Sequence, residues 1–186
     1  GRLDAPNVIT PQVSTINSLS LDHTYLLGDT LAEIAYEKAG IIKPGVPVVT
    51  APQKEEALEV IRRTADERDA PLTIVGEDVQ WTPVSRTLSG QEIQVTWPTG
   101  DSALAGTYEV ALLGDFQQEN AAVALAAAEV LRQTDHDWVT PRSVQDGLRQ
   151  VSWPGRMEIL NQEPRIIVDC AHNPYSAQTL VDSLKI

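Results

Sequence analysis

The stretch VPVVT at residues 46–50 decides the fold class, because it is a short apolar run with β-branched residues directly after a Pro44-Gly45 turn. Residues 53–68, QKEEALEVIRRTADER, have the apolar period of an amphipathic helix, and PLTIVG at residues 71–76 predicts the next strand. The order strand, helix, strand predicts a parallel sheet covered by helices. The residues expected to face inward from the helix are Ala57, Leu58, Val60, Ile61 and Ala65.

The residues before this unit also predict a strand followed by a helix. Residues 13–19, VSTINSL, predict a strand that ends before Asp22. Asp29-Thr30 can cap a helix over residues 31–39, and we expect Gly40 to end that helix in the left-handed conformation.

The middle and the end of the chain differ from this pattern. Alternating segments at residues 91–97 and 107–112, separated by Gly, Ser and Thr, predict antiparallel strands. An Ala-rich helix is expected over residues 118–132 and a second helix, capped by Thr140-Pro141, up to about residue 150.

The motif Trp153-Pro154-Gly155-Arg156 predicts a domain boundary. After it come a short strand at residues 157–160, a strand at 165–169 and a helix at 174–184, too little to bury both faces of a sheet. We therefore predict an α/β fold with two parts. Residues 1–153 form most of a central domain with a mainly parallel sheet plus an antiparallel portion, and residues 154–186 begin a second α/β domain.

Composition excludes several classes of protein. The 186 residues contain 14 Lys and Arg against 26 Asp and Glu, a net charge of −12, so a broad basic face for nucleic acid or anionic lipid is not expected. A single cysteine, Cys170, excludes a disulfide framework and a Cys-rich zinc site. With no long apolar run and no signal pattern, we expect a cytoplasmic protein, and the start at Gly1 without Met suggests a segment of a longer chain.

Two clusters of polar residues are candidates for chemistry. Asp22-His23 follows a strand, where parallel sheets place their ligand crevice, and His23 could ligate a divalent metal or merely satisfy loop backbone groups. Lys38 could extend from the apolar stripe into solvent, or could be a desolvated amine that reacts with carbon dioxide to form a carbamate.

The second cluster is DCAHNP at residues 169–174, between a strand and a helix. Asn173 and Pro174 fit a helix N-terminus without any further function, which leaves Asp169 and His172 unexplained. Arg156 could pair with phosphate or could be an ordinary surface residue. The sequence has no phosphate-loop motif Gly-x-x-x-x-Gly-Lys-[Ser/Thr] and no Gly-x-Gly-x-x-Gly.

Five motifs in order resemble the folylpolyglutamate synthase family, which includes bifunctional dihydrofolate synthases and belongs to the Mur ligase-like superfamily. These motifs are GRLDAPNV at residues 1–8, NSLSLDHT at 17–24, IAYEKAGIIKPG at 34–45, the segment 114–121, and PGR at 154–156 with DCAHNP at 169–174. The resemblance implies ATP-dependent ligation of glutamate to a folate or dihydropteroate carboxylate through an acyl phosphate, with Mg²⁺ as the metal. It also implies a monomeric parent protein.

The resemblance further implies a role for individual residues. His23 and Lys38 resemble magnesium ligands, Lys38 in its carbamylated form, and Lys38 and His172 are the catalytic candidates. The nucleotide-binding candidates are Asn120, Arg156 and Asp169, and the substrate-binding candidates are Leu3 and Asp4.

Departures from the family and alternatives to it remain. Cys170 stands where the family commonly has Gly, and Phe116 where many members have a polar residue. The family's phosphate loop would lie upstream of Gly1, so we expect the chain alone to be inactive. The alternatives are a Mur-type or cyanophycin-type amino acid ligase and a non-catalytic module of the same fold.

Overall fold

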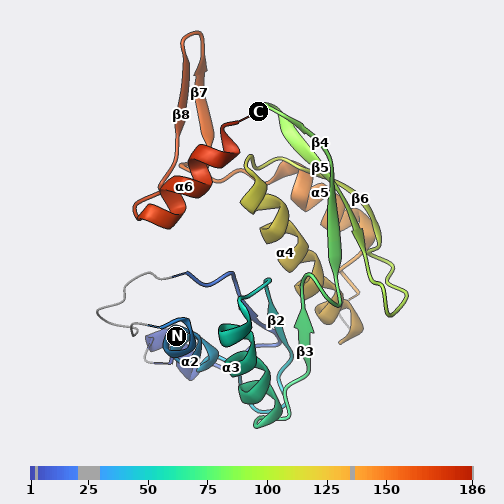
Figure 1. The fold of residues 1–186 in the computed structure, drawn as a ribbon. Coiled ribbons are helices and arrows are strands. Elements are labelled where there is room, and N and C mark those ends of the chain that lie inside the picture. The colour runs from blue at the N-terminus through green and yellow to red at the C-terminus, as the bar shows by residue number, and fades with distance from the viewer. Residues whose placement is uncertain (3, 21–29, 135–136, 186) are drawn as a thin grey trace.

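Three small sheets and the helices between them make up the chain in a computed structural model that describes residues 1–2, 4–20, 30–134 and 137–185 (Figure 1). The elements are, in chain order, the 3-10 helix η1 (Ala5–Val8), β1 (Ser14–Ile16), α2 (Leu31–Ala39), β2 (Val48–Thr50), α3 (Glu55–Asp66), β3 (Leu72–Ile74), β4 (Gln80–Thr87), β5 (Gly90–Thr96), β6 (Gly106–Val110), α4 (Asp115–Gln133), α5 (Pro141–Gln150), β7 (Glu158–Gln162), β8 (Arg165–Val168) and α6 (Pro174–Ser183).

The first sheet is parallel, as the sequence predicted. Its order is β1-β2-β3, with Val48 of β2 opposite both Ser14 and Leu72. Val48 and Val49 are completely buried because helices and neighbouring strands cover them. All five residues expected to face inward from α3 are buried: Ala57, Leu58, Val60, Ile61 and Ala65.

Helix α2 has the predicted bounds, but the glycine that follows it differs in conformation from the expectation. Thr30 caps its start with a reciprocal pair of bonds to Glu33, as a capping box requires. The expectation that Gly40 is left-handed is wrong, since its φ is −58°. Glycine is needed there because a Cβ would lie 2.5 Å from the Cβ of Arg2.

The second sheet is antiparallel, with the order β4-β5-β6. Its buried Ile93, Val95 and Tyr108 form a core with the apolar face of α4, including Leu125. Helix α4 begins at Asp115, three residues before the predicted start, while α5 begins after Thr140 as predicted. The fold class is therefore confirmed as α/β with a parallel sheet and an antiparallel portion.

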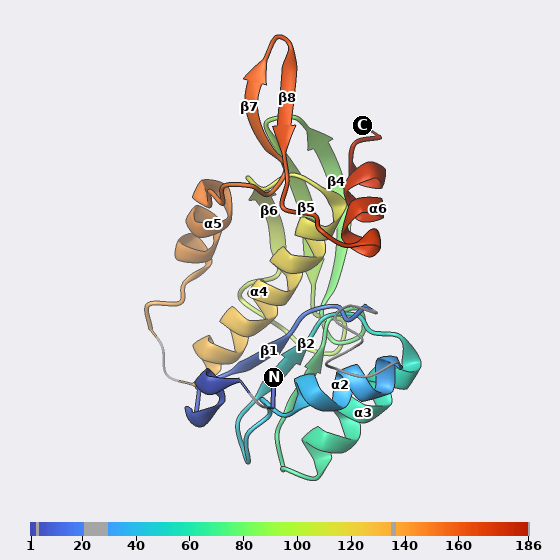
Figure 2. The same cartoon turned by 90° about the vertical axis from the view of Figure 1, so that its left-hand side faces the viewer.

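The last part of the chain is the β7–β8 hairpin and α6, which follow the predicted boundary. Both views show the hairpin projecting away from the rest of the molecule (Figures 1 and 2). Asn173 caps α6 with a capping box, which confirms its expected structural role. The division of the chain into domains at residue 153 stays a prediction. Within the described ranges, no helix combines the length and the apolar character that a membrane span requires.

Candidate functional site

A cleft of about 960 Å³ lies between the end of β1, the first turns of α4 and the segment that joins β8 to α6. The carboxyl end of a parallel strand and the start of a helix are the usual places for ligands in α/β proteins. The cleft is lined by Asn17, Ser18, Lys38, Trp81, Asp115, Phe116, Glu119, Asn120, Arg156, Asp169, Cys170, Ala171, His172, Tyr175, Ser176 and Thr179.

Five of the predicted site residues come together in this cleft from four separate segments of the sequence: Lys38, Asn120, Arg156, Asp169 and His172. Asp4 instead lines a separate pocket of about 270 Å³ with Asn7 and Lys43. The predicted residues Leu3 and His23 lie outside the described residues.

The carboxylate of Asp169 organises the segment after the domain boundary. Its Oδ2 accepts a hydrogen bond from the Met157 backbone N–H at 2.9 Å, and its Oδ1 accepts one from the Ala171 N–H at 2.7 Å. Because each carboxylate oxygen can accept more than one hydrogen bond, these contacts leave capacity for a ligand hydroxyl. Asp169 thus fixes the loop that carries Arg156 and remains able to bind a ligand.

Further hydrogen bonds hold the same loop. The Gly155 N–H donates to Glu158 Oε2 at 2.8 Å, and the Cys170 N–H donates to the Gly155 carbonyl at 2.9 Å. A Cβ at Gly155 would lie 2.7 Å from Cys170 Sγ, and the φ of Gly155 is +73°. The backbone conformation just before Arg156 therefore requires glycine at position 155.

The His172 ring has a defined orientation. Its Nδ1 lies 2.9 Å from the Cys170 carbonyl oxygen, which can only accept, so Nδ1 carries the proton. In the neutral ring Nε2 is then a hydrogen-bond acceptor. The His172 backbone N–H donates to Ser176 Oγ at 3.1 Å, which ties the loop to the first turn of α6.

Asn120 and Lys38 face the cleft from two different helices. The Asn120 side-chain amide donates to Gln117 Oε1 at 3.0 Å, which fixes its rotation on α4. Lys38 lies in the last turn of α2, one turn after the buried Ile34, and is half-buried itself. Its positive charge contributes, after the chain N-terminus, to the lowered pKa of Asp4.

Glu119 is a cleft residue that the sequence reasoning missed. Burial raises the pKa of this carboxyl, and a hydrogen bond from Ser18 partly opposes the shift. A charged residue in a helix beside a predicted nucleotide contact has no distinctive sequence signal. Only the approach of the segment after β1 to the first turns of α4 brings it to Ser18.

Comparison with known proteins supports the resemblance, although no family model matches the chain. The chain is 35% identical over 185 residues to a dihydrofolate synthase/folylpolyglutamate synthase from Bacillus subtilis, and 36% identical over 192 residues to a folylpolyglutamate synthase from Lacticaseibacillus casei. Both matches cover 100% of this chain and 42% of the relative. Over its whole length, the chain is a homologue of the folylpolyglutamate synthases.

Solved folylpolyglutamate synthase structures have the same fold. A folylpolyglutamate synthase complex with AMPPCP and folate matches with a TM-score of 0.90 and 36% identity, over 100% of this chain and 44% of that chain. A Mycobacterium tuberculosis folylpolyglutamate synthase complexed with ADP matches with a TM-score of 0.83 and 31% identity. The chain thus spans less than half the length of these folylpolyglutamate synthases.

The two departures from the folylpolyglutamate synthase pattern both lie in the cleft. Phe116 and Cys170 are among its lining residues. The Phe116 ring also packs at Gly114, where a Cβ would lie 2.6 Å from Phe116 Cε1. Phe116 therefore supplies an apolar surface to the cleft.

Proposed function

We propose that the protein carrying this sequence is an ATP-dependent ligase that joins L-glutamate to the carboxylate of a folate or dihydropteroate. The observation that carries the proposal is the single cleft that gathers Lys38, Asn120, Arg156, Asp169 and His172 from four separate segments. A related synthase was solved with AMPPCP and folate, which supports both the nucleotide and the acceptor.

The reaction requires activation because a carboxylate and an amine do not condense in water. The acceptor carboxylate oxygen attacks the γ-phosphorus of ATP, which forms an acyl phosphate and releases ADP. The amine of glutamate then attacks the acyl carbon, loses a proton, and the tetrahedral intermediate expels inorganic phosphate. One amide bond forms for each ATP that is cleaved.

The chain's own residues bind and orient in this scheme. Asn120 holds the nucleotide base from α4, and Arg156 pairs with the nucleotide from the loop that Asp169 fixes. Asp169 uses its remaining acceptor capacity on a ribose hydroxyl. His172, with Nδ1 held by the Cys170 carbonyl, presents Nε2 as a positioning acceptor.

Mg²⁺ belongs to the same proposal, with His23 and carbamylated Lys38 as its ligands from this chain. A divalent cation would neutralise charge between phosphate and carboxylate. The parts of the chain that the structure describes contain no group of three His, Cys, Asp or Glu side chains able to hold a metal. The proposed site therefore depends on His23 and on modification of Lys38.

The pocket beside Asp4 is the proposed contact for the acceptor. Asp4 lies there with Asn7, and Lys43 Nζ donates to the Asn7 carbonyl at 2.5 Å. Leu3 belongs to the same proposed segment. We also propose a cytoplasmic, monomeric parent protein, and a chain that does not turn over alone because its 186 residues contain no phosphate-loop motif.

The test is ADP release by the complete protein that carries this sequence, with dihydropteroate or tetrahydrofolate as acceptor and glutamate as amine. We expect glutamate-dependent ADP release with at least one acceptor, and at least about tenfold lower kcat/KM for Arg156→Ala, which removes a charged contact. Arg62→Met is the matched control, because Arg62 pairs with Glu77 on the surface. Release with a different amino acid would favour the Mur-type alternative, and no release would favour a non-catalytic module.

Titration of the 186-residue chain with Mg-ATP tests the second part of the proposal. We expect weak or undetectable binding. A micromolar Kd would show that the chain binds nucleotide without a phosphate loop.

A further inference from the structure

Helix α4 begins without a side-chain cap of its own. Its N-cap is Gly114, so the first backbone N–H, that of Asp115, needs a partner from elsewhere. That N–H donates to Ser183 Oγ of α6 at 3.3 Å. Ser183 is only 1% exposed and is the one buried residue of α6.

Arg86 of β4 joins the same two helices. Its Nη1 forms an ion pair with Asp115 Oδ1, and its Nη2 donates to the Lys185 carbonyl at 2.9 Å. The planar guanidinium can hold both partners at once, which a lysine amine cannot do in the same geometry. Figures 1 and 2 both show the end of the chain beside the end of β4.

Arg86 is more buried than the arginine of an ordinary surface ion pair, although its partner Asp115 is 61% exposed. The Arg86 side chain is 21% exposed, against 45% for Arg62 in its pair with Glu77. Exposed ion pairs contribute little because water competes for both partners, so the feature that distinguishes this contact is the simultaneous bond from Arg86 Nη2 to the Lys185 carbonyl. We name Arg86, Asp115, Ser183 and the Lys185 carbonyl together the α4–α6 contact.

A close packing contact holds the start of α4 from another side. Gly114 has a φ of +101°, and a Cβ there would lie 2.8 Å from Met157 Sδ. Met157 is buried and donates its backbone N–H to Asp169. The first turn of α4 is thus fixed both to α6 and to the loop that carries Arg156.

The two helices joined in this way form facing parts of the cleft. The first turns of α4 contribute Asp115, Phe116, Glu119 and Asn120, and α6 contributes Tyr175, Ser176 and Thr179. Neither Arg86 nor Ser183 is among the lining residues. We infer that Arg86 and Ser183 are positioning residues, which set the separation of the two walls of the cleft through the α4–α6 contact.

Amide hydrogen exchange on the 186-residue chain tests the structural half of this inference. Loss of one hydrogen bond or ion pair at this site should raise exchange about tenfold at residues 115–120 and 174–183 in Arg86→Met and Ser183→Ala. Exchange in α3 should stay unchanged in both variants. In the control Arg62→Met, exchange should stay unchanged at residues 115–120 and 174–183 as well. Unchanged exchange at α6 in both variants would overturn the inference.

Arg86→Lys separates charge from geometry. It keeps the positive charge but cannot hold Asp115 and the Lys185 carbonyl together, so exchange at α6 should remain above that of the unmodified chain. Full rescue by lysine would show that charge alone is sufficient and would contradict a positioning role for the guanidinium.

The link to nucleotide affinity rests on the proposed function and needs the complete protein. We expect Arg86→Met and Ser183→Ala to raise the KM for ATP about fivefold with a smaller change in kcat, since the binding walls move while the reacting groups stay intact. Faster exchange with an unchanged KM would overturn the positioning role. A complete protein without any ligase activity would instead refute the proposed function, and the exchange result would still decide whether the contact holds α6.

Discussion

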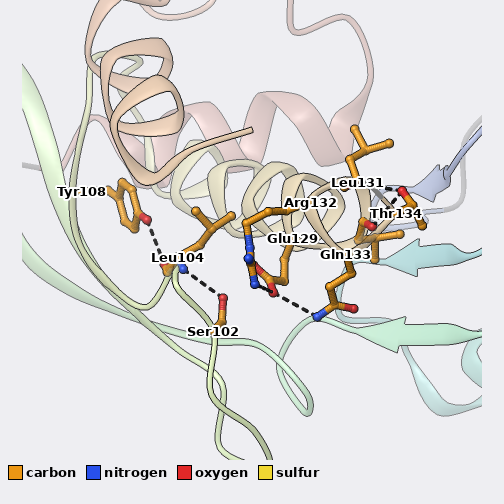
Figure 3. Close-up of polar contacts among 9 residues, drawn as sticks. Ser102, Leu104, Tyr108, Glu129, Leu131, Arg132, Gln133 and Thr134 are labelled. Atoms are coloured by element: carbon orange, nitrogen blue, oxygen red, sulfur yellow. Dashed lines mark hydrogen bonds and ion pairs between the residues drawn. The ribbon is translucent and has the colours of Figure 1, made fainter. Parts of the chain in front are cut away.

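At its C-terminal end helix α4 carries Glu129, which is 4% exposed, whereas the side chain of Asp115 at its N-terminal end is 61% exposed. Glu129 accepts hydrogen bonds from Arg132 at 2.8 and 2.9 Å and from Gln133 at 2.9 Å (Figure 3). Arg132 and Gln133 are near neighbours on the same helix, and Ser102 adds one hydrogen bond from outside α4, while the partners of Asp115 come from β4 and α6.

The pKa of Glu129 reflects this local arrangement. Burial acts to raise it, but the hydrogen bonds from Arg132, Ser102 and Gln133 outweigh burial and lower it overall. Tyr108 nearby donates to the Leu104 carbonyl at 2.8 Å, and burial raises its pKa (Figure 3). One end of α4 is therefore fixed mainly by residues close in sequence, and the other by segments that a small displacement of α6 would separate.

The largest effect is expected in the middle of the helix, where both ends depend on the same core. Leu125 is completely buried, so Leu125→Ala should lower the free energy of unfolding by about 3 kcal/mol through the cavity it leaves. Urea unfolding followed by circular dichroism measures the change. A loss confined to one end of α4 in hydrogen exchange would show that the two ends are not joined by a common core.

A substitution at Gly114 should affect the N-terminal end more than the C-terminal end. Gly114→Ala places a side chain at a φ of +101° and against Met157, so we expect a loss of about 2 kcal/mol. Hydrogen exchange should rise at residues 115–120 more than at residues 128–133. Equal increases at both ends would contradict the separation between them.

The Glu129 cluster should make stability dependent on pH. The pKa of Glu129 is lower in the folded chain than its ordinary value of 4.5, so its contribution is present above about pH 4.5 and is lost as pH falls through the lower folded pKa. Glu129→Gln should cost about 1 kcal/mol at pH 7 and reduce this acid dependence. Urea midpoints between pH 3 and pH 7 measure both effects. If the midpoint of Glu129→Gln depends on pH as strongly as that of the unmodified chain, Glu129 is not the source of the acid dependence.

The smallest effect is expected for the surface pair of Arg62 and Glu77. Their side chains are 45% and 52% exposed, and Arg62→Met should change the free energy of unfolding by less than about 0.5 kcal/mol. The urea midpoint of this variant therefore serves as the baseline for the other three. If Arg62→Met lowered the free energy of unfolding as much as Glu129→Gln does, exposure would not distinguish the Arg62–Glu77 pair from the Arg132–Glu129 pair.

Local sequence patterns predicted most elements of the fold. The apolar period of α3 identified its five buried residues, and Thr30, Thr140 and Asn173 each cap the helix expected of them. The start of α4 was wrong by three residues because the contacts of Gly114 and Asp115 come from distant segments, which no local pattern records. The predicted left-handed conformation of Gly40 was also wrong. Glycine is required there because Arg2, which is distant in the sequence, packs against it.

The candidate site was predictable only where motifs carried it. The resemblance indicated Lys38, Asn120, Arg156, Asp169 and His172, and all five line one cleft. The resemblance gave no role to Glu119 or Ser18, and their hydrogen bond exists because the segment after β1 approaches the first turns of α4. The proposed roles of Leu3 and His23 concern residues outside the described ranges.

By itself the sequence determined where helices and strands form and which faces they bury, because caps and apolar periods act between residues a few positions apart. Only the tertiary structure decided that α6 caps α4 through Ser183 and that Arg86 joins the two. Such contacts depend on how separate elements pack in space. Hydrogen bonds of 2.9–3.3 Å between such elements leave no period or spacing in the chain.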